Sequence, residues 1–214
     1  MPDSTATAAI RPETVEQIAA RSQIDPDYLI LMGMSGILAA VAFLSNSVPL
    51  LVGAMIVSPV FAPLALVGFA FVGDRKDYVR AGLKAVAVGL AVAVVAATAT
   101  AWILNVTDVF PPDENLFDKP LLKERLSVGW FSVVSAAAAG IAGNIALSRD
   151  RFDTLIGVLA ALALVPAAAA AGIAFISGNL GMAFGGVMLL FVNASVTIVT
   201  GIVVLRWLRP DQNG

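Results

Sequence analysis

The sequence predicts an all-α polytopic membrane protein with six transmembrane helices, arranged as a 3+3 inverted-topology repeat with both termini in the cytoplasm. Hydrophobic residues make up 59% of the 214 residues and charged residues only 13%, about half the charged fraction that is usual in soluble domains. Uncharged runs of spanning length alternate with short charged turns, and the basic residues are divided unequally between the two sides that these runs define.

The first half of the chain contains three predicted spans. No charged residue occurs from Tyr28 to Gly73, and this run is too long for one span of about 20 residues. The sequence SNSVP at 45–49 divides it, because these residues favour turns. A charged loop at 73–77 separates this run from the next apolar segment. The predicted helices are 28–45, 49–72 and 80–105.

The second half follows a polar connection that contains Pro111, Pro112, Pro120 and four acidic residues between positions 108 and 118. A fourth helix precedes the charged loop at 149–153. The chain is then uncharged from Thr154 to Leu205, again too long for one span, and Ser177-Gly178-Asn179 forms the break. The predicted helices are 127–147, 154–176 and 181–206.

These helices divide the chain into five regions. The N-terminal arm, 1–27, is polar and lacks the apolar segment of a secretory signal. Pro12 and the residues after it predict a short helix, which we interpret as a solvated or interfacial cap. The regions are 1–27 (cytoplasmic arm), 28–105 (first three-helix repeat), 106–126 (extracytoplasmic loop), 127–207 (second three-helix repeat) and 208–214 (cytoplasmic tail).

The basic residues predict the orientation. Ten of the 13 Lys and Arg residues fall on the side that holds the N-terminus, and only Lys119, Lys123 and Arg125 fall on the other. Basic loops remain cytoplasmic during insertion. We therefore expect a multi-pass protein of a prokaryotic cytoplasmic (inner) membrane, with both termini in the cytoplasm and the acidic 106–126 loop outside.

An internal repeat is indicated by matching residues in the two halves. Three helices per half is an odd number, so the halves must cross the membrane in opposite orientations. The loop at Gly73 is charged and its counterpart at Gly178 is not, as expected for opposite sides of a membrane. The matched pairs are Gly53 with Gly157 and Gly68 with Gly172, 104 residues apart, and Gly73 with Gly178 and Trp102 with Trp207, 105 residues apart.

Prolines interrupt the second and fifth predicted helices. Pro59, Pro63 and Pro166 each remove a backbone donor, which would leave the carbonyl groups of Met55, Pro59 and Leu162 without a helical partner. Unpaired polar groups are costly in hydrocarbon, so water, a hydroxyl or a solute must satisfy them. Interrupted helices at corresponding positions of two halves indicate a transport site, although prolines also occur as simple packing kinks.

Few polar side chains lie deep in the predicted spans. Ser58 adjoins Pro59, and Asn193 is central in the sixth helix, where its amide either contacts a solute or joins two helices. The spans contain no Asp, Glu, Lys or Arg near their centres, which argues against proton coupling. Met55, Ser58, Pro59, Pro63, Leu162, Pro166 and Asn193 are therefore the candidate solute-binding residues.

Composition also excludes several classes of function. The chain has no Cys and no His, which removes thiol nucleophiles, His acid–base chemistry and most metal sites. Hydroxyls such as that of Ser58 lack a base to activate them. We expect no enzymatic activity, no cofactor and no metal. A net charge of −2 without a basic tract gives no indication of nucleic-acid binding.

The motifs of both halves resemble a prokaryotic membrane family catalogued as domain of unknown function 389. In the first half the resemblance rests on Ser35, Asn46-Ser47, Gly53-Ala54-Met55, Ser58-Pro59 with Pro63, and Gly73-Asp74. In the second half it rests on Gly140, Gly157, Leu164-Val165-Pro166, Gly172 and Asn193. The chain has Pro166-Ala167 where the family commonly has two prolines. The resemblance covers about residues 28–207 and supports the topology but implies no substrate.

Two functions remain open at this stage. The first is a channel or transporter for a small solute or ion, with the proline-interrupted helices 2 and 5 lining a site at the membrane midplane. The alternative is a non-transporting membrane scaffold or sensor subunit that acts through protein partners. The lipid bilayer is the expected surrounding in both, and the Ala-rich helix faces are compatible with a homo-oligomer.

Overall fold

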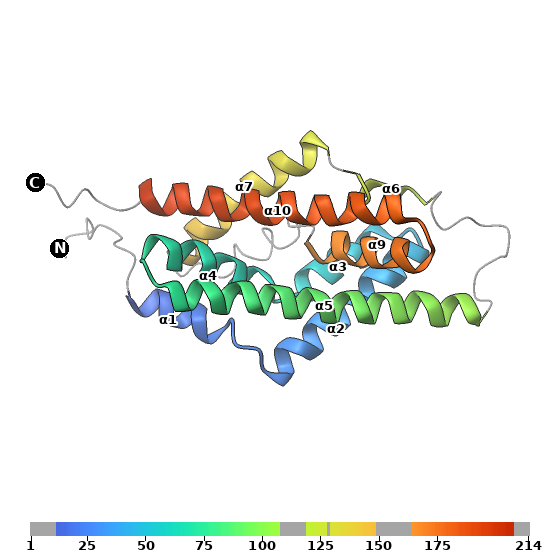
Figure 1. Ribbon diagram of the computed structural model, residues 1–214, viewed down its shortest axis with the longest axis horizontal. Coiled ribbons are helices and arrows are strands. Elements are labelled where there is room, and N and C mark those ends of the chain that lie inside the picture. The colour runs from blue at the N-terminus through green and yellow to red at the C-terminus, as the bar shows by residue number, and fades with distance from the viewer. Residues whose placement is uncertain (1–11, 108–118, 128, 149–163, 208–214) are drawn as a thin grey trace, which may run out of the picture.

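The computed structural model describes residues 12–107, 119–127, 129–148 and 164–207, and all regular structure in these ranges is helical. The two longest helices, α5 and α10, run in opposite directions along the molecule (Figure 1), and α4 and α9 each contact both of them. The helices are α1 (Pro12–Ala20), α2 (Pro26–Leu44), α3 (Val48–Val57), α4 (Phe61–Val72), α5 (Lys76–Val106), α6 (Pro120–Glu124), α7 (Trp130–Ser148), α9 (Leu164–Ile176) and α10 (Leu180–Trp207).

Four described helices, α2, α5, α7 and α10, are long and apolar enough to cross a membrane, and a fifth span results if α3 and α4 count as one. Their ends lie within four residues of the predicted first, third, fourth and sixth helices. Helix α9 is apolar and shorter, with 13 residues, and the predicted segment 154–163 of the fifth helix lies outside the described residues.

The second predicted helix, over 49–72, is present as two helices. The helix breaks at residues 58–60, and α3 and α4 are bent by 50° relative to one another. Ser58 has extended backbone angles (φ −70°, ψ 122°), and Pro59 has no N–H to continue the helical hydrogen-bond pattern of α3. The break therefore occurs at the Ser-Pro pair that the sequence singles out.

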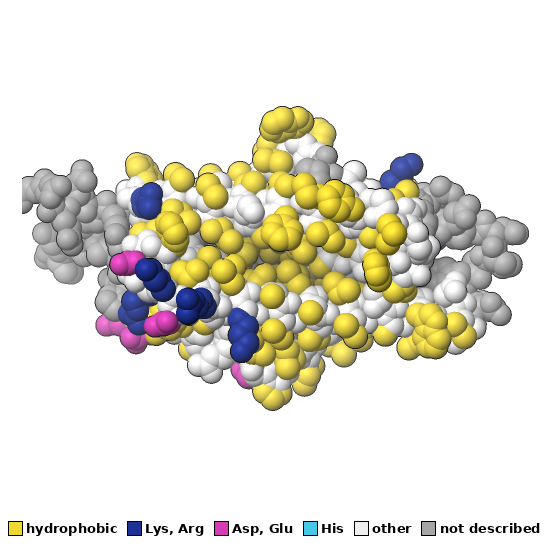
Figure 2. All heavy atoms as spheres, viewed as in Figure 1, with side chains coloured by type: hydrophobic (Ala, Val, Ile, Leu, Met, Phe, Trp, Pro, Cys, Tyr) yellow, Lys and Arg dark blue, Asp and Glu magenta, His cyan; other side chains and the backbone are white. Residues whose placement is uncertain are grey.

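Large apolar side chains cover the outside of the helices. Val95 is 66% exposed and Phe191 67% exposed, and hydrophobic atoms dominate the middle of the face in Figure 2. Soluble monomers rarely carry apolar surface on this scale. The apolar helices and their apolar outer surface are consistent with a lipid bilayer environment.

Small residues bring the helices of each half into close contact. A methyl group added at Gly36 of α2 would meet the backbone of Ala93 in α5, 2.9 Å from its Cα atom. A methyl group added at Gly140 of α7 would meet the backbone of Thr197 in α10 at 3.0 Å. Helices α2 and α5, and likewise α7 and α10, are thus packed backbone to backbone, at positions 104 residues apart in the sequence.

The helix ends recur with the same spacing of 104 residues. Helices α2 and α7 have equivalent first and last residues, α4 and α9 equivalent last residues, and α5 and α10 equivalent first residues. The corresponding pairs are Pro26 with Trp130, Leu44 with Ser148, Val72 with Ile176, and Lys76 with Leu180.

The turns before α5 and α10 also have the same hydrogen bonds. Arg75 N donates to Ala70 O at 2.8 Å, and Asn179 N donates to Ala174 O at 2.9 Å. Asp74 and Gly178 have positive φ angles of 54° and 75°. The structural counterpart of Gly178 is therefore Asp74, not Gly73 as the sequence comparison suggests.

Contacts between the two halves recur reciprocally. A methyl group at Gly68 of α4 would lie 3.9 Å from backbone atoms of Ile198 and Ile202 in α10. A methyl group at Gly172 of α9 would lie 2.7 Å from Val94 and 2.9 Å from Thr98 in α5. Gly68 and Gly172, 104 residues apart, thus each lie against a long helix from the other half of the sequence.

Candidate functional site

The break between α3 and α4 leaves main-chain groups without helical hydrogen-bond partners. Pro59 cannot donate to the carbonyl oxygen of Met55, as a helical residue at that position would. The Ser58 side chain is only 2% exposed. Its hydroxyl donates to Met32 Sδ and accepts from Val60 N, both at 3.4 Å. Neither partner is a base, so this geometry provides no activation of the serine as a nucleophile.

A cavity of about 360 Å³ lies against this break. Ser58, Pro59, Phe61 and Ala62 form one wall, so the cavity is lined by the broken segment and the first turn of α4. The first backbone N–H groups of a helix have no intrahelical acceptor. The wall therefore combines a hydroxyl with the polar main chain of an interrupted helix.

The opposite wall comes from the N-terminal arm and the start of α2. It includes Arg21 and Gln23 of the connection between α1 and α2, together with Asp25 and Asp27. Asp25 Oδ1 accepts a hydrogen bond from Tyr28 N at 2.7 Å and caps α2. From the sequence alone, these residues are expected in a solvated arm. The cap signal Asp25-Pro26 marks the helix start, but nothing in the sequence indicates that the arm folds back toward Ser58.

Tyr28 connects this wall to the core. Its side chain is 4% exposed, and its hydroxyl donates to Ala85 O of α5 at 2.8 Å. The ring packs against Gly89 of α5. A side chain at residue 89 would collide with the ring, because even a methyl group there would lie 2.9 Å from Tyr28 Cζ. The first turn of α2 is thereby fixed beside the cavity.

Of the other predicted site residues that the structure describes, none lines this cavity. Met55 is buried in α3. Pro63 is the third residue of α4, where a missing N–H would have no helical acceptor, so Pro63 removes no hydrogen bond from within α4. Pro166 is the third described residue of α9. Leu162 lies outside the described residues.

Asn193 occupies a separate position on α10. It is 3% exposed, and its Oδ1 has no hydrogen-bond partner among the described residues. Gly186 of α10 packs against Ala171 of α9, and α9 and α10 are joined by a tight turn. From this contact, two helical turns toward the C-terminus of α10 lead to Asn193, and two turns toward the N-terminus of α9 lead to its first described residues. Asn193 is therefore level with those residues. A buried amide oxygen without a partner is costly.

The described residues contain no group of three or more His, Cys, Asp or Glu side chains that could hold a metal ion. The polar groups that line the cavity are thus a hydroxyl, backbone groups and the charged side chains of the arm. Such groups suit reversible contacts with a solute or a hydrated ion.

Comparison with known proteins gives a family match. A family model described as "Domain of unknown function (DUF389)" matches residues 55–199, more than half of the chain. The chain is also 23% identical over 212 residues to "Uncharacterized protein MJ0678" of Methanocaldococcus jannaschii. The match covers 95% of this chain and 63% of that relative, so the chain spans less than two thirds of the relative's length. No solved structure matches the chain.

Proposed function

The chain belongs to the DUF389 family, and we propose that it is a membrane channel or transporter for a small solute or ion. The observation that carries this proposal is the broken helix pair α3–α4, whose Ser58 and Pro59 line a cavity beside the break. Interrupted helices at the interface of two repeats are the usual place for substrate and ion sites in transporters. The proposal includes no catalytic role, because the Ser58 hydroxyl contacts no base.

The proposed topology has six spans as a 3+3 inverted repeat, with both termini in the cytoplasm. The helix ends, turn hydrogen bonds and reciprocal glycine contacts that recur 104 residues apart support two equivalent halves. Helices α5 and α10 run in opposite directions (Figure 1), as equivalent helices of inverted halves must. The excess of basic residues on the N-terminal side supports the orientation in an inner membrane.

The α3–α4 pair is proposed as a broken span and not as a re-entrant loop. With ten and twelve residues, α3 and α4 are about 15 and 18 Å long. A 50° bend keeps both helices advancing in the same general direction, whereas a re-entrant loop must reverse. Together with the three residues of the break, they approach the roughly 30 Å of a hydrocarbon core.

The same geometry suggests how a solute would pass. The break removes the helical donor for Met55 O and leaves the first N–H groups of α4 available. These groups, with the Ser58 hydroxyl, would replace part of the hydration of a small neutral solute or an ion. Asp25, Asp27 and Arg21 on the opposite wall would contribute charge at the mouth of the cavity.

Flux through proteoliposomes tests this function. The purified protein is reconstituted and its permeability to alkali cations, halides and small neutral solutes is compared with that of Pro59→Ala and Ser58→Ala variants. We expect a flux in the parent protein that changes about tenfold in the variants, equivalent to about 1.4 kcal/mol in the barrier. Pro49→Ala and Ser45→Ala, at exposed positions, should leave the flux unchanged.

If the parent protein conducts none of these solutes above protein-free liposomes, the transport proposal fails and a scaffold or sensor subunit replaces it. If the parent conducts but the Ser58 and Pro59 variants conduct equally well, the pathway does not run through the break.

A further inference from the structure

The short helices α1 and α6 are in equivalent positions in the two halves. Helix α1 ends at Ala20 and α2 begins at Pro26; 104 residues later, α6 ends at Glu124 and α7 begins at Trp130. Each short helix inserts one large apolar side chain at the equivalent position, Ile18 with 3% exposure and Leu122 with 0% exposure. Neither correspondence is apparent in the sequence, because the residues themselves differ.

The connections that follow the two short helices share two equivalent backbone hydrogen bonds. Ser22 N donates to Ala19 O at 3.1 Å, and Leu126 N donates to Lys123 O at 3.2 Å. Further along, Leu29 N donates to Asp25 O at 3.1 Å, and Val133 N donates to Gly129 O at 3.4 Å. The repeated unit therefore begins with a short helix before its first long helix.

Helix α1 is anchored beside the broken span. Val15 and Ile18 are buried in a cluster that includes Phe61, Ala65 and Phe69 of α4. The connection after α1 then passes along the cavity at the break, where Arg21 and Gln23 face the wall that contains Ala62. Docking of Ile18 on α4 thus positions the connection over the cavity.

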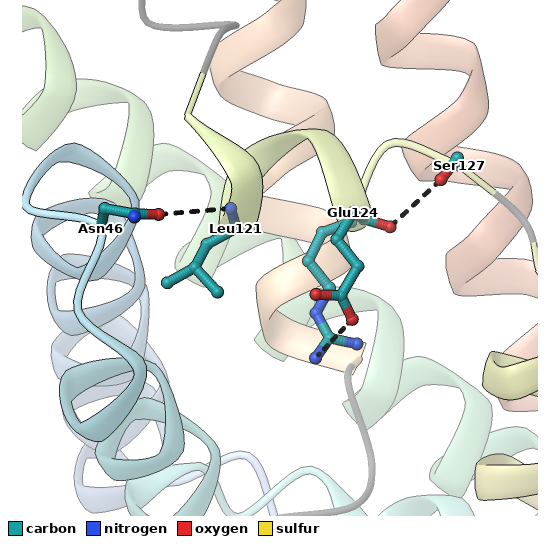
Figure 3. Close-up of polar contacts among 5 residues, drawn as sticks. Asn46, Leu121, Glu124 and Ser127 are labelled. Carbon is teal, nitrogen blue, oxygen red and sulfur yellow. Dashed lines mark hydrogen bonds and ion pairs between the residues drawn. The ribbon is translucent and has the colours of Figure 1, made fainter.

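Helix α6 is anchored at the other end of the molecule (Figure 1). Leu122 is packed in the main core cluster with residues of α2, α3 and α9. Leu121 N donates to Asn46 Oδ1 at 3.3 Å, which ties α6 to the turn between α2 and α3 (Figure 3). A methyl group at Gly185 would collide with Leu126 O, so the connection after α6 lies directly on α10.

We propose that α1 and α6, each with the connection that follows it, are paired caps that close the two halves at opposite membrane faces. The α1 cap covers the α3–α4 break from the side of the N-terminus, and its opening requires Ile18 to leave its site on α4. The α6 cap covers the second half from the other side, and its opening requires Leu122 to leave the core. This inference rests on the inverted repeat proposed above.

Cysteine labelling tests the α1 cap without measuring flux. The chain contains no cysteine, so Ala62→Cys introduces a single thiol in the cavity wall. A membrane-impermeant maleimide is applied to membrane vesicles from the side of the N-terminus, and the labelling rate is compared with and without Ile18→Asn. If the cap of the parent protein is open for about 10% of the time or less, Ile18→Asn would leave it open for most of the time. We therefore expect the labelling rate to rise about tenfold.

The matched control is Gln17→Asn, on the exposed side of α1, which should leave the labelling rate of Ala62→Cys unchanged. Thr107→Cys, exposed at the end of α5, reports an intact fold when its labelling from the opposite side is the same with and without Ile18→Asn. If Ile18→Asn changes the labelling rate of Thr107→Cys, Ile18→Ala is used in its place, because it removes the same contacts without burying an amide. It should also raise the labelling rate of Ala62→Cys.

The α6 cap is tested in the same way from the opposite face. Val165→Cys, the equivalent of Phe61 in the cavity wall, should be labelled about tenfold faster with Leu122→Asn and at the parent rate with Lys123→Asn. An unchanged rate for Ala62→Cys in the Ile18 variants, or acceleration from both faces at once, would overturn the paired caps. Either result leaves the flux assay, and with it the transport proposal, to be decided separately.

Discussion

Gly36 lies where α2 comes closest to α5. A methyl group there would meet the backbone of Ala93, which cannot move aside as a flexible side chain can. We expect Gly36→Ala to force the two helices apart and to destabilise the protein by about 1–3 kcal/mol, the usual cost of overpacking. Thermal unfolding in detergent, followed by tryptophan fluorescence, should show a lower Tm by about 2–4 °C per kcal/mol.

Gly53 provides the matched control, since a methyl group at this position of α3 would meet nothing within 4 Å. Gly53→Ala should leave Tm unchanged or raise it, because alanine is favoured over glycine in a helix by about 1 kcal/mol. Equal effects of the two substitutions would contradict the close contact between α2 and α5.

Ser35 joins α2 to α3, the first of the two helices at the break. Its side chain is fully buried, and its hydroxyl donates to Ala54 O of α3 at 2.6 Å. We expect Ser35→Ala to cost about 0.5–2 kcal/mol, in the range of interhelical hydrogen bonds in membranes. Ser45→Ala removes a hydroxyl that bonds only within its own helix, so its effect on Tm should be smaller. A larger loss with Ser45→Ala would refute this assignment.

Individual residues also show how far sequence reasoning extends. Ser58 and Pro59 are predictable as a break, because proline acts on the helix through its own missing N–H. The position of Pro63 relative to the break is not predictable in this way, since the start of α4 decides whether its missing donor matters. Asp25 and Arg21 reach the cavity through tertiary contacts of the arm, and no local pattern encodes such contacts.

At the scale of secondary-structure elements, the start of α2 depends on the cap formed by Asp25. Asp25 Oδ1 accepts from Tyr28 N at 2.7 Å, and Pro26 occupies the first helical position. We expect Asp25→Ala to destabilise the protein by about 0.5–2 kcal/mol. Asp27→Asn, which removes a charge in the first turn of the same helix, should cost no more than about 1 kcal/mol. Comparable chemical denaturation curves for the Asp25 variant and the parent would exclude a stabilising cap.

Helices can be predicted from the sequence where the length of an uncharged apolar stretch determines their ends. Charged segments, together with the uncharged turns at 45–49 and 177–179, define α2, α5, α7 and α10 to within a few residues, because a spanning helix needs an uncharged stretch of fixed length. Helix α6 has only five residues and no periodic pattern, so the sequence predicts a loop there. Its existence depends on Leu122, whose burial follows from the arrangement of α2 and α3 and not from neighbouring residues.

The distribution of surface residues gives the whole molecule two distinct ends. Most Lys and Arg side chains on the face in Figure 2 gather at the end where α5 begins, and Arg75, Lys76, Arg80 and Arg206 are all exposed. Trp102 and Trp207, 61% and 81% exposed, lie near the last turns of the antiparallel helices α5 and α10. Tryptophans at both ends match the positions of two membrane interfaces.

The number of spans in the first half decides the topology of the entire chain. With α2, the α3–α4 pair and α5 each crossing once, Thr107 lies on the opposite side from the N-terminus. With α3–α4 as a re-entrant loop, Thr107 lies on the same side.

Fusions after Thr107 separate these cases, because alkaline phosphatase is active only outside the cytoplasm and green fluorescent protein folds efficiently only inside it. We expect an active phosphatase and a dark fluorescent protein after Thr107, and the reverse for fusions after Gly214. Fluorescence at both positions would eliminate the inverted repeat, because two halves with an even number of spans cannot be inverted.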